Sequence, residues 1–320
     1  MVGKLTWFRA TSSITCGLFD RGRFFDKHDC LSRGIDDKNG TYVDNYKQTN
    51  RQATGDLLEP VLITEAARRL GITELEAEVD YKIVHPKLPL EASLDGRCKA
   101  VNLKVKHSPE DGIYIVGHDE LILNGDIPIE CKCSSDFPSV DEPPKYLGVD
   151  QLHTSMEILN ADYGILIVLF QSTDLRLYIY KKDEAFKGEL ERVVLDFNRR
   201  IDEEDYYPPE KPEHAATIFS NGNDENEKIL SAETVDLIDT IEALKETVKI
   251  AKQKQDELMT DLMMVMGNHS KARAAEYVLE WKTLPAKKAQ VKEVHYKAAP
   301  ERRAGFVKIK TTGWRRRADS

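Results

Sequence analysis

The sequence predicts a mixed α/β unit over residues 1–206, followed by a linker, a long helix and a basic C-terminal segment. Short apolar or alternating runs support the strands, and stretches with apolar residues at helical spacing support the helices. An apolar content of 41% with 32% charged residues is typical of a globular protein, and 320 residues suffice for one large core or two small ones. The expected strands are Ile113–Val116, Pro128–Cys133, Gly164–Phe170 and Leu175–Lys181.

Helical spacing is clearest from Leu58 to Leu70, where apolar residues recur every three or four positions and Gly71 provides a stop. Pro60 lies near the start of this run, so it either kinks the helix after Glu59 or begins a new one. Two further helices are expected at 150–160 and Glu184–Arg200. The stretch from Arg97 to Asn124 is expected to add a hairpin around Asp111-Gly112.

The strand around Glu130 carries the most informative pattern. Side chains alternate between the two faces of a strand, so Glu130 and Lys132 share one face while Cys131 points to the other. A carboxylate and an ammonium together on an otherwise apolar strand indicate chemistry. The alternative is a surface ion pair on an edge strand.

Two further carboxylates would complete a metal site with Glu130. Asp95 lies in an Asp-Gly turn, where a strand ends and a side chain can project into a cleft, and Glu59 precedes Pro60. Hard oxygen ligands select Mg²⁺ or Mn²⁺, which also bind phosphate. Lys132 would then orient or activate water, or offset charge in the transition state.

Other interpretations of these acids remain open. Glu59 would also suit the start of a helix, where the dipole favours an acid. Glu91 and Asp126 lie close to the motifs in sequence and would be alternative ligands, although Asp126 follows Asn124-Gly125 and is more typical of a turn.

Four short motifs occur in one order along the chain: Gly55-x-x-x-Glu59, Ser93-x-Asp95-Gly96, Glu130-x-Lys132 and Gln151-x4-Met156. In these motifs, the stretch from about Trp7 to Tyr180 resembles the lambda-exonuclease and YqaJ-like viral recombinase branch of the PD-(D/E)xK nucleases. The resemblance implies a restriction-endonuclease-like core, with a central mixed sheet flanked by helices, over residues 1–206. It also implies a Mg²⁺-dependent exonuclease that degrades one strand of linear duplex DNA from its 5′ end.

Further implications of the resemblance concern partners and place of action. The 3′ single strands would be coated by a single-strand annealing protein during phage-type recombination, and the family's closed ring suggests a homo-oligomer, a trimer. A phage-encoded protein acting in the cytoplasm of a bacterial host is expected. The longest apolar run, Ile165–Phe170, is far below the roughly 20 residues of a membrane span, and the first residues lack a signal pattern.

Residue by residue, the resemblance makes Asp95 and Glu130 metal ligands, with Glu59 binding or orienting at the second of two ions. Cys131 is counted in the same metal set. Lys132 corresponds to the catalytic lysine of the family. The remaining catalytic position is that of the family's helical glutamine, Gln151.

The family's pocket for the 5′-phosphate corresponds to two other positions. Ser93, two residues before Asp95, matches a serine that helps to bind the terminal phosphate. Arg9 is the candidate for the arginine that grips it, although its spacing differs, and Cys16-Gly17 replaces the Ala-Ser that follows in the family.

The C-terminal third divides into a linker at 207–231, a helix at 232–267 and a basic segment at 268–320. Apolar residues of the helix alternate steps of four and three in about four heptads, interrupted by Gln255. This helix packs on its own domain, associates with another copy, or forms an antiparallel hairpin.

The basic segment is expected to form a small β-hairpin from strands at 277–283 and 306–311, with Trp281 among basic side chains. From Lys271 to Ser320 the chain carries 14 Lys or Arg against 5 Asp or Glu, a net +9 in a chain of −9 overall. A basic tail behind an acidic body suggests contact with nucleic acid. The alternative is a solvated tail that pairs with the acidic body of its own or a neighbouring subunit.

The five cysteines lack zinc-ribbon spacing and are expected to be reduced core thiols. Two further functions remain open beside the exonuclease. One is a catalytically idle protein that binds DNA ends or supports assembly through its tail and long helix. The other is a repair endonuclease on the same core.

Overall fold

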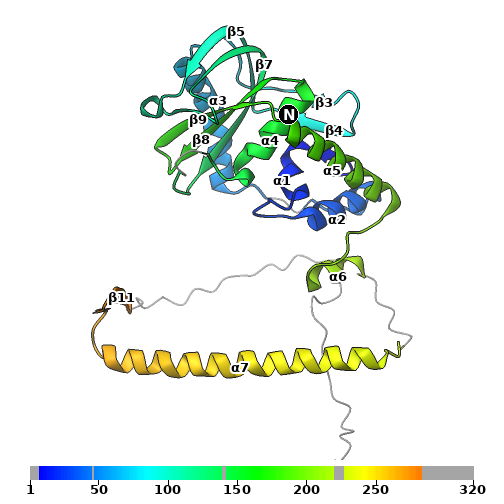
Figure 1. Cartoon of the computed structure of the whole chain (residues 1–320), viewed down its shortest axis with the longest axis vertical. Coiled ribbons are helices and arrows are strands. Elements are labelled where there is room, and N and C mark those ends of the chain that lie inside the picture. The colour runs from blue at the N-terminus through cyan, green and yellow to red at the C-terminus, as the bar shows by residue number, and fades with distance from the viewer. Residues whose placement is uncertain (1–6, 45–46, 139–141, 220–226, 283–320) are drawn as a thin grey trace, which may run out of the picture. The chain divides into compact units, whose positions relative to one another are not determined.

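The computed structural model describes residues 7–44, 47–138, 142–219 and 227–282 and divides the chain into two compact units, Met1–Pro209 and Glu210–Ser320 (Figure 1). The helices of the first unit are η1 (Ser12–Ile14), α1 (Thr15–Leu18), α2 (Lys27–Lys38), α3 (Asn50–Leu70), η2 (Pro109–Asp111), η3 (Lys145–Val149), α4 (Asp150–Leu159) and α5 (Glu184–Glu203). Its strands are β1 (Ala10–Thr11), β2 (Glu74–Glu76), β3 (Lys82–Val84), β4 (Leu90–Ser93), β5 (Gly96–Lys106), β6 (Ile113–Ile115), β7 (Glu120–Ser134), β8 (Tyr163–Phe170) and β9 (Asp174–Lys181).

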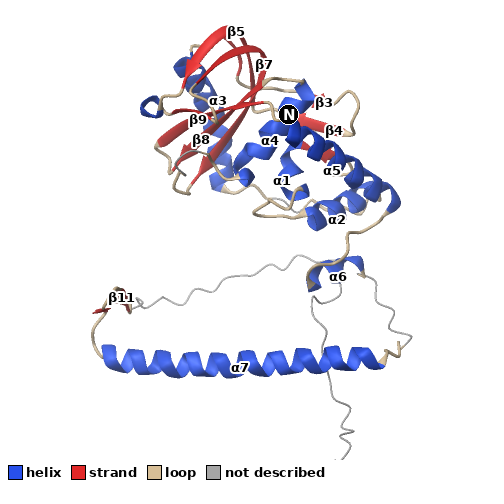
Figure 2. Cartoon of the chain, in the orientation of Figure 1, coloured by secondary structure: helices blue, strands red, loops and turns tan. Residues whose placement is uncertain are grey.

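The first unit is built on a six-stranded mixed sheet of order β2-β5-β7-β8-β9-β6 (Figure 2). Strands β7 and β8 run parallel, as do β6 and β9, and the other neighbours are antiparallel. The first unit also contains a smaller, three-stranded sheet of order β1-β4-β3. The predicted α/β class, with a central mixed sheet flanked by helices, is therefore confirmed.

Helices cover both faces of the large sheet, and β8 shows why its sequence is apolar throughout. Ile165 and Ile167 face the core that includes α3, whereas Leu166 and Val168 face the core that includes α4. A strand buried on both faces needs apolar residues at every position, not only at alternate ones. The sheet thus separates α3 from α4 (Figure 1).

Helix α3 begins earlier than the apolar periodicity predicted. A capping box between Thr49 and Gln52 starts it, and Gly71 ends it in a left-handed conformation, with φ of 75°. Pro60 therefore lies inside one continuous helix and does not begin a new one. The sequence missed the first turns because they are exposed and carry no apolar face.

Strand β7 also extends beyond its prediction, since it begins at Glu120 and not at Pro128. Its first half pairs with β5, so the predicted additional hairpin is present as the β5–β7 pair, with Gly112 in a left-handed turn within the connection. Asp126 lies in this strand opposite Lys99, which corrects its interpretation as a turn residue.

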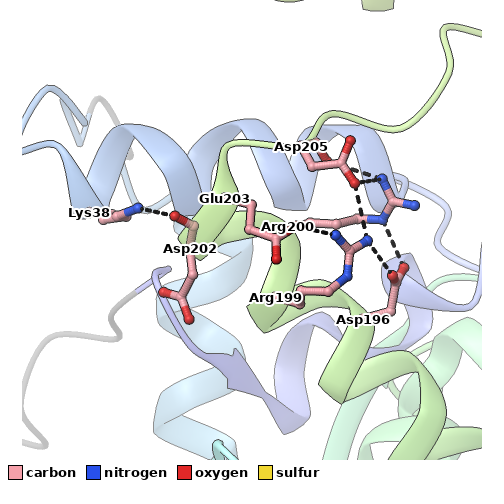
Figure 3. A network of polar contacts seen from close by, with 7 residues as sticks. All are labelled: Lys38, Asp196, Arg199, Arg200, Asp202, Glu203 and Asp205. Atoms are coloured by element: carbon pink, nitrogen blue, oxygen red, sulfur yellow. Dashed lines mark hydrogen bonds and ion pairs between the residues drawn. The ribbon is translucent and has the colours of Figure 1, made fainter.

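A third core joins α1, α2, α5 and the small sheet. At the end of α5, Arg199 and Arg200 each contact Asp196 and Asp205, and Lys38 of α2 donates to the main-chain oxygen of Asp202 at 2.8 Å (Figure 3). A lysine on terminal helix carbonyls satisfies acceptors that the helix leaves free. The Lys38 contact fixes α2 to the end of α5, whereas the arginine contacts fasten the end of α5 to the residues that follow it.

The second unit holds α6 (Pro212–Ile218), α7 (Ala232–Met266), β10 (Lys271–Ala274) and β11 (Tyr277–Glu280). α6 lies in the stretch predicted to be linker and buries His214. β11 begins where a strand was expected, but it pairs with β10, and the expected partner at 306–311 lies outside the described residues. Among the helices of the described residues, none is long and apolar enough to cross a membrane.

Candidate active site

Glu130 and Lys132 lie on the same face of β7, as the strand period predicted. Glu130 is in register with Leu166 of β8, whose side chain faces α4. The Lys132 ammonium donates a hydrogen bond to Oε1 of Glu130. The Glu130 side chain is only 1% exposed, whereas the Lys132 side chain is 31% exposed. The pair therefore opens to solvent through its lysine and is no surface ion pair.

Asp95 joins this pair from a different part of the chain. It lies between the end of β4 and the start of β5, and its Oδ2 is 3.7 Å from Nζ of Lys132. The backbone N–H of Cys131 donates to the same Oδ2 at 2.8 Å. Asp95 is thus held by one main-chain donor and faces one cation.

Cys131 has a different role from the one predicted. Its side chain packs in the core on the α3 side of the sheet, and burial raises the pKa of its thiol. A protonated, buried thiol is a poor ligand for a hard cation. The structure therefore does not support a metal role for the sulfur of Cys131, and the residue contributes the N–H that orients Asp95.

The charges of the three groups depend on one another. Burial and the nearby charge of Asp95 raise the pKa of Glu130 well above its ordinary value, against the opposing effect of Lys132. Burial lowers the pKa of Lys132, but the charges of Glu130 and Asp95 outweigh it and raise that pKa overall. Lys132 is therefore an ammonium at neutral pH, able to donate but not to accept a proton.

Glu59 lies on α3, and its carboxyl group feels the charges of Asp95 and Lys132. Burial, followed by the charge of Asp95, raises the pKa of Glu59 to about 7, and Lys132 opposes this shift. The predicted acids Glu59, Asp95 and Glu130 are therefore electrostatically linked around Lys132, although they belong to three separate elements.

The donor set fits a divalent cation. Burial, followed by the negative charge of Asp95, raises the pKa values of both Glu59 and Glu130. A hard cation would offset this repulsion and accept all three as oxygen ligands. In the described part of the chain, no three His, Cys, Asp or Glu side chains are already arranged around a common metal position. Instead, the Lys132 ammonium contacts both Glu130 and Asp95.

Gln151 lies in the first turn of α4. This helix follows a sharp bend that packs on Glu130 and Lys132. Gly148 in this bend has φ of 93°, and a Cβ atom on it would lie 3.2 Å from Cγ of Glu130 and 3.3 Å from Cγ of Lys132. The bend brings the start of α4 next to the site, but among the described residues no hydrogen bond joins the Gln151 amide to Asp95, Glu130 or Lys132. Gly148 was not predicted, because an isolated glycine carries no signal of its tertiary neighbours.

The two predicted phosphate-binding residues are placed apart. The Ser93 hydroxyl oxygen is buried and has no hydrogen-bond partner within the described residues, which suits a ligand-binding role. Arg9 is exposed and immediately precedes β1, whose Ala10 pairs with Leu90 at the start of β4. Ser93 is the last residue of that strand, roughly 10 Å further along from Leu90. The strand pairing therefore does not bring Arg9 to Ser93.

A second arginine, Arg21, contacts the start of α4. The sequence did not predict it as a site residue. Arg21 donates to Asp150 at 3.3 Å and to Glu189 at 3.1 Å, and its guanidinium stacks on the Phe19 ring. Asp150 is almost fully buried, and burial raises its pKa against the effect of Arg21. The alternation of Arg and Gly around Arg21 resembles any exposed loop, so sequence alone did not identify it.

The alternative acids have their own cations. Asp126 pairs with Arg97 at 2.9 Å, and Glu91 pairs with Lys82 at 2.8 Å. Neither contact involves Lys132. A groove of about 560 Å³ is lined by Arg51 and Gly55 of α3 and by residues at the end of β7, but not by Asp95, Glu130 or Lys132. Gly55 lies one turn before Glu59, and nothing approaches the position of its missing Cβ within 4 Å.

Comparisons with known proteins gave matches only among solved structures. An alkaline exonuclease of Laribacter hongkongensis, LHK-Exo, matches with 16% identity over 62% of this chain and 90% of its own, at a TM-score of 0.42. The same enzyme in complex with dAMP matches with 18% identity over the same shares, at a TM-score of 0.43. A phage-related exonuclease from Haemophilus somnus 129PT matches with 12% identity over 61% of this chain and 94% of its own, at a TM-score of 0.36.

No protein-family model and no curated protein matches the sequence. The three structures above are described as those of an alkaline exonuclease and of a phage-related exonuclease. Since all of these TM-scores lie below 0.5, a functional assignment depends on the motifs and on the geometry of the site.

Proposed function

We propose that this chain is a metal-dependent deoxyribonuclease that hydrolyses phosphodiester bonds of linear double-stranded DNA. One observation carries the proposal: Asp95 and Glu130, distant in sequence, both contact the Lys132 ammonium at a partly exposed site. Two carboxylates beside a lysine are groups that phosphodiester hydrolysis with a hard cation uses.

Mg²⁺ is the proposed cofactor, with Mn²⁺ as a substitute and two ions at the site. Asp95 and Glu130 would hold the first ion, and Glu59 would hold or orient the second. When bound, such ions polarise the phosphoryl oxygen and supply a nucleophilic water at neutral pH.

The residues of the chain contribute positioning and charge. The N–H of Cys131 holds the Asp95 carboxylate in one orientation. Lys132, charged at neutral pH, offers its ammonium to a phosphate oxygen or to the attacking water and so offsets negative charge in the transition state. The groove beside Gly55 provides room for a nucleic-acid strand next to Glu59.

Strand polarity and biological role follow from the resemblance. The enzyme would digest from the 5′ end and leave 3′ single-stranded overhangs for recombination by strand annealing, together with a single-strand annealing protein. Gln151 would hold a water or a phosphate oxygen, and Ser93 would bind the 5′-phosphate. Arg9 would take part only if its side chain reaches the phosphate from the opposite end of β4. The homo-oligomer that the resemblance implies would retain the DNA during repeated cleavage.

The decisive experiment is digestion of an end-labelled linear duplex, phosphorylated at its 5′ ends, with and without Mg²⁺. Separate labels at the 5′ and 3′ ends report strand polarity in the same assay. Wild type should degrade the duplex only with the metal, and Lys132→Ala should lower the rate by at least about a hundredfold. Glu91→Gln serves as a control, since Glu91 pairs with Lys82 and not with Lys132.

Two other results would exclude the exonuclease. Intact DNA with tight, salt-sensitive binding would identify a catalytically idle end-binding protein. Cleavage of a closed circular duplex would identify an endonuclease, because an enzyme that requires ends leaves a circle intact.

A further inference from the structure

Helix α7 carries an apolar seam that the described residues of its own unit leave uncovered. It runs for 35 residues, about 50 Å, and of these residues Met266 is the buried one. Long helices in proteins owe most of their stability to packing of an apolar face, so an uncovered seam of this length calls for a partner. Within the second unit, the described residues provide none.

The seam residues follow a heptad repeat without a skip. Those at the first core position of each heptad, position a, are Ile241, Val248, Gln255 and Leu262, and those at the second core position, position d, are Leu237, Leu244, Ala251, Leu258 and Val265. The larger apolar residues among them are exposed at 36% or more. A repeat of 3.5 residues is the pattern of a coiled coil and not of a helix lying on a globular core.

We propose that α7 forms a parallel, two-stranded coiled coil with α7 of a second copy of this chain. In parallel coiled coils, β-branched residues at a with leucine at d favour two strands. Ile241 with Leu244 follows this rule, and Val248 has a β-branched a position. Only the last pair, Leu262 and Val265, has the reverse order.

The polar residue in the seam selects the parallel arrangement. In a parallel pair in register, Gln255 faces Gln255 of the other chain, and the two amides can hydrogen-bond to each other. In an antiparallel pair with full overlap, Gln255 would face Leu244, which leaves a buried amide without a partner. A single polar a position also fixes register and the number of strands, at a cost in stability.

The charges that flank the seam agree with this choice. In the parallel pair, Lys245 lies beside Thr240 of the other chain and Lys252 beside Thr247, and no two like charges meet across the seam. In the antiparallel pair, Lys245 would face Lys252 at two symmetric places. Like charges so placed destabilise association.

The proposal is independent of the nuclease activity, and its test is the mass of the full-length chain by sedimentation equilibrium over a range of concentrations. Wild type should be a dimer. Leu244→Asn should weaken the dimer by roughly a hundredfold or more, since it removes an apolar core residue from both chains. Ile250→Asn is the matched control: Ile250 is 59% exposed and Leu244 60%, but Ile250 lies off the seam, so dimerisation should be unchanged.

Two further measurements keep the result clear if Leu244→Asn lowers helicity. Gln255→Val should strengthen association, because it replaces the polar layer by an apolar one. A photocrosslinker at position 237 should react with the same region of the other chain if the helices are parallel.

Three results would overturn the proposal. One is a wild-type chain that remains monomeric at concentrations of about 10 μM, as for a helix that packs within its own chain. Another is an assembly of any size, a trimer included, whose mass is the same in wild type and in Leu244→Asn. The third is crosslinking from position 237 to the region of Leu262, which would identify an antiparallel pair.

Discussion

Gly148 lies directly against Glu130, since a Cβ atom on this glycine would be only 3.2 Å from Cγ of the glutamate. The same Cβ atom would be 3.0 Å from Cδ1 of Leu166, so the core residue on its other side gives it no free space either. The bend before α4 therefore sets the position of the buried carboxylate. A methyl group at Gly148 would push on the candidate metal ligand from the side of α4.

We expect Gly148→Ala to lower nuclease activity by about a hundredfold, as small displacements in an active site do, and to destabilise the fold by about 1–3 kcal/mol through strain at positive φ. Gly125→Ala is the matched control, because Gly125 also has positive φ, 82°, but nothing lies within 4 Å of its Cβ position. Urea unfolding and a digestion assay on both variants separate strain from displacement. Equal activity in the two variants would show that Gly148 does not position Glu130.

Replacing Glu130 should separate activity from stability. Glu130→Gln removes a buried carboxylate that is costly to ionise, while Lys132 keeps Asp95 within 3.7 Å and remains partly exposed. The free energy of unfolding should therefore change by no more than about 1 kcal/mol, whereas activity should fall by roughly a thousandfold.

Glu91→Gln provides the comparison for this prediction, because Glu91 is also buried and paired with a lysine. This variant should retain nuclease activity. If Glu91→Gln is inactive and Glu130→Gln is active, the metal ligand is Glu91, which is the alternative that the sequence left open.

The sequence sufficed for those parts of the site that local patterns encode. The period of two in β7 places Glu130 and Lys132 on one face, and the Asp-Gly turn places Asp95 at a strand end. The positions of Gly148 and Arg21 depend on contacts between segments far apart in the chain, and no local pattern records such contacts. The long first half of β7 was missed for a different reason: its short apolar run, Leu121–Leu123, is followed by Asn124-Gly125, a turn signal that interrupts the strand pattern.

Arg9 shows the limit of assigning residues by resemblance. The motif order suggested that Arg9 and Ser93 form one phosphate pocket, yet β1 and β4 pair in parallel with Ala10 opposite Leu90. This register leaves Arg9 at the start of β4 and Ser93 at its end. Register depends on the pairing of distant strands, which a spacing of residues along one chain does not determine.

Ser93→Ala should therefore report phosphate binding without damage to the fold. The buried Ser93 hydroxyl has no partner within the described residues, so its removal relieves a desolvation cost, and stability should stay equal or rise by up to about 1 kcal/mol. If Ser93 binds the terminal phosphate, the preference for phosphorylated over hydroxyl 5′ ends should fall by about tenfold.

Arg9→Ala should reduce the same preference if Arg9 reaches the phosphate. The ratio of digestion rates on the two kinds of end is the measurement for both variants. An unchanged ratio in Arg9→Ala, with a reduced ratio in Ser93→Ala, would assign the phosphate pocket to Ser93 without Arg9.

His153 should make an unfavourable contribution to the stability of the first unit in mild acid. Its ring lies 5.1 Å from the rings of both Tyr180 and Phe186, and burial, with a smaller effect of Lys145, lowers its pKa from 6.5 to about 4. Between these two values the unfolded chain binds a proton that the folded chain does not. Stability is therefore lost as the pH falls through the unfolded value, and the loss levels off below the folded one.

For this histidine, the loss between about pH 7 and about pH 5 is roughly 2 kcal/mol in the free energy of unfolding. His153→Phe keeps an aromatic ring between Tyr180 and Phe186 but has no group to protonate, so its unfolding free energy should fall by about 2 kcal/mol less over the same interval. Urea unfolding of both proteins at the two pH values measures the difference. If the two proteins lose equal stability, His153 is not the group responsible, because the remaining acids and histidines are common to both chains.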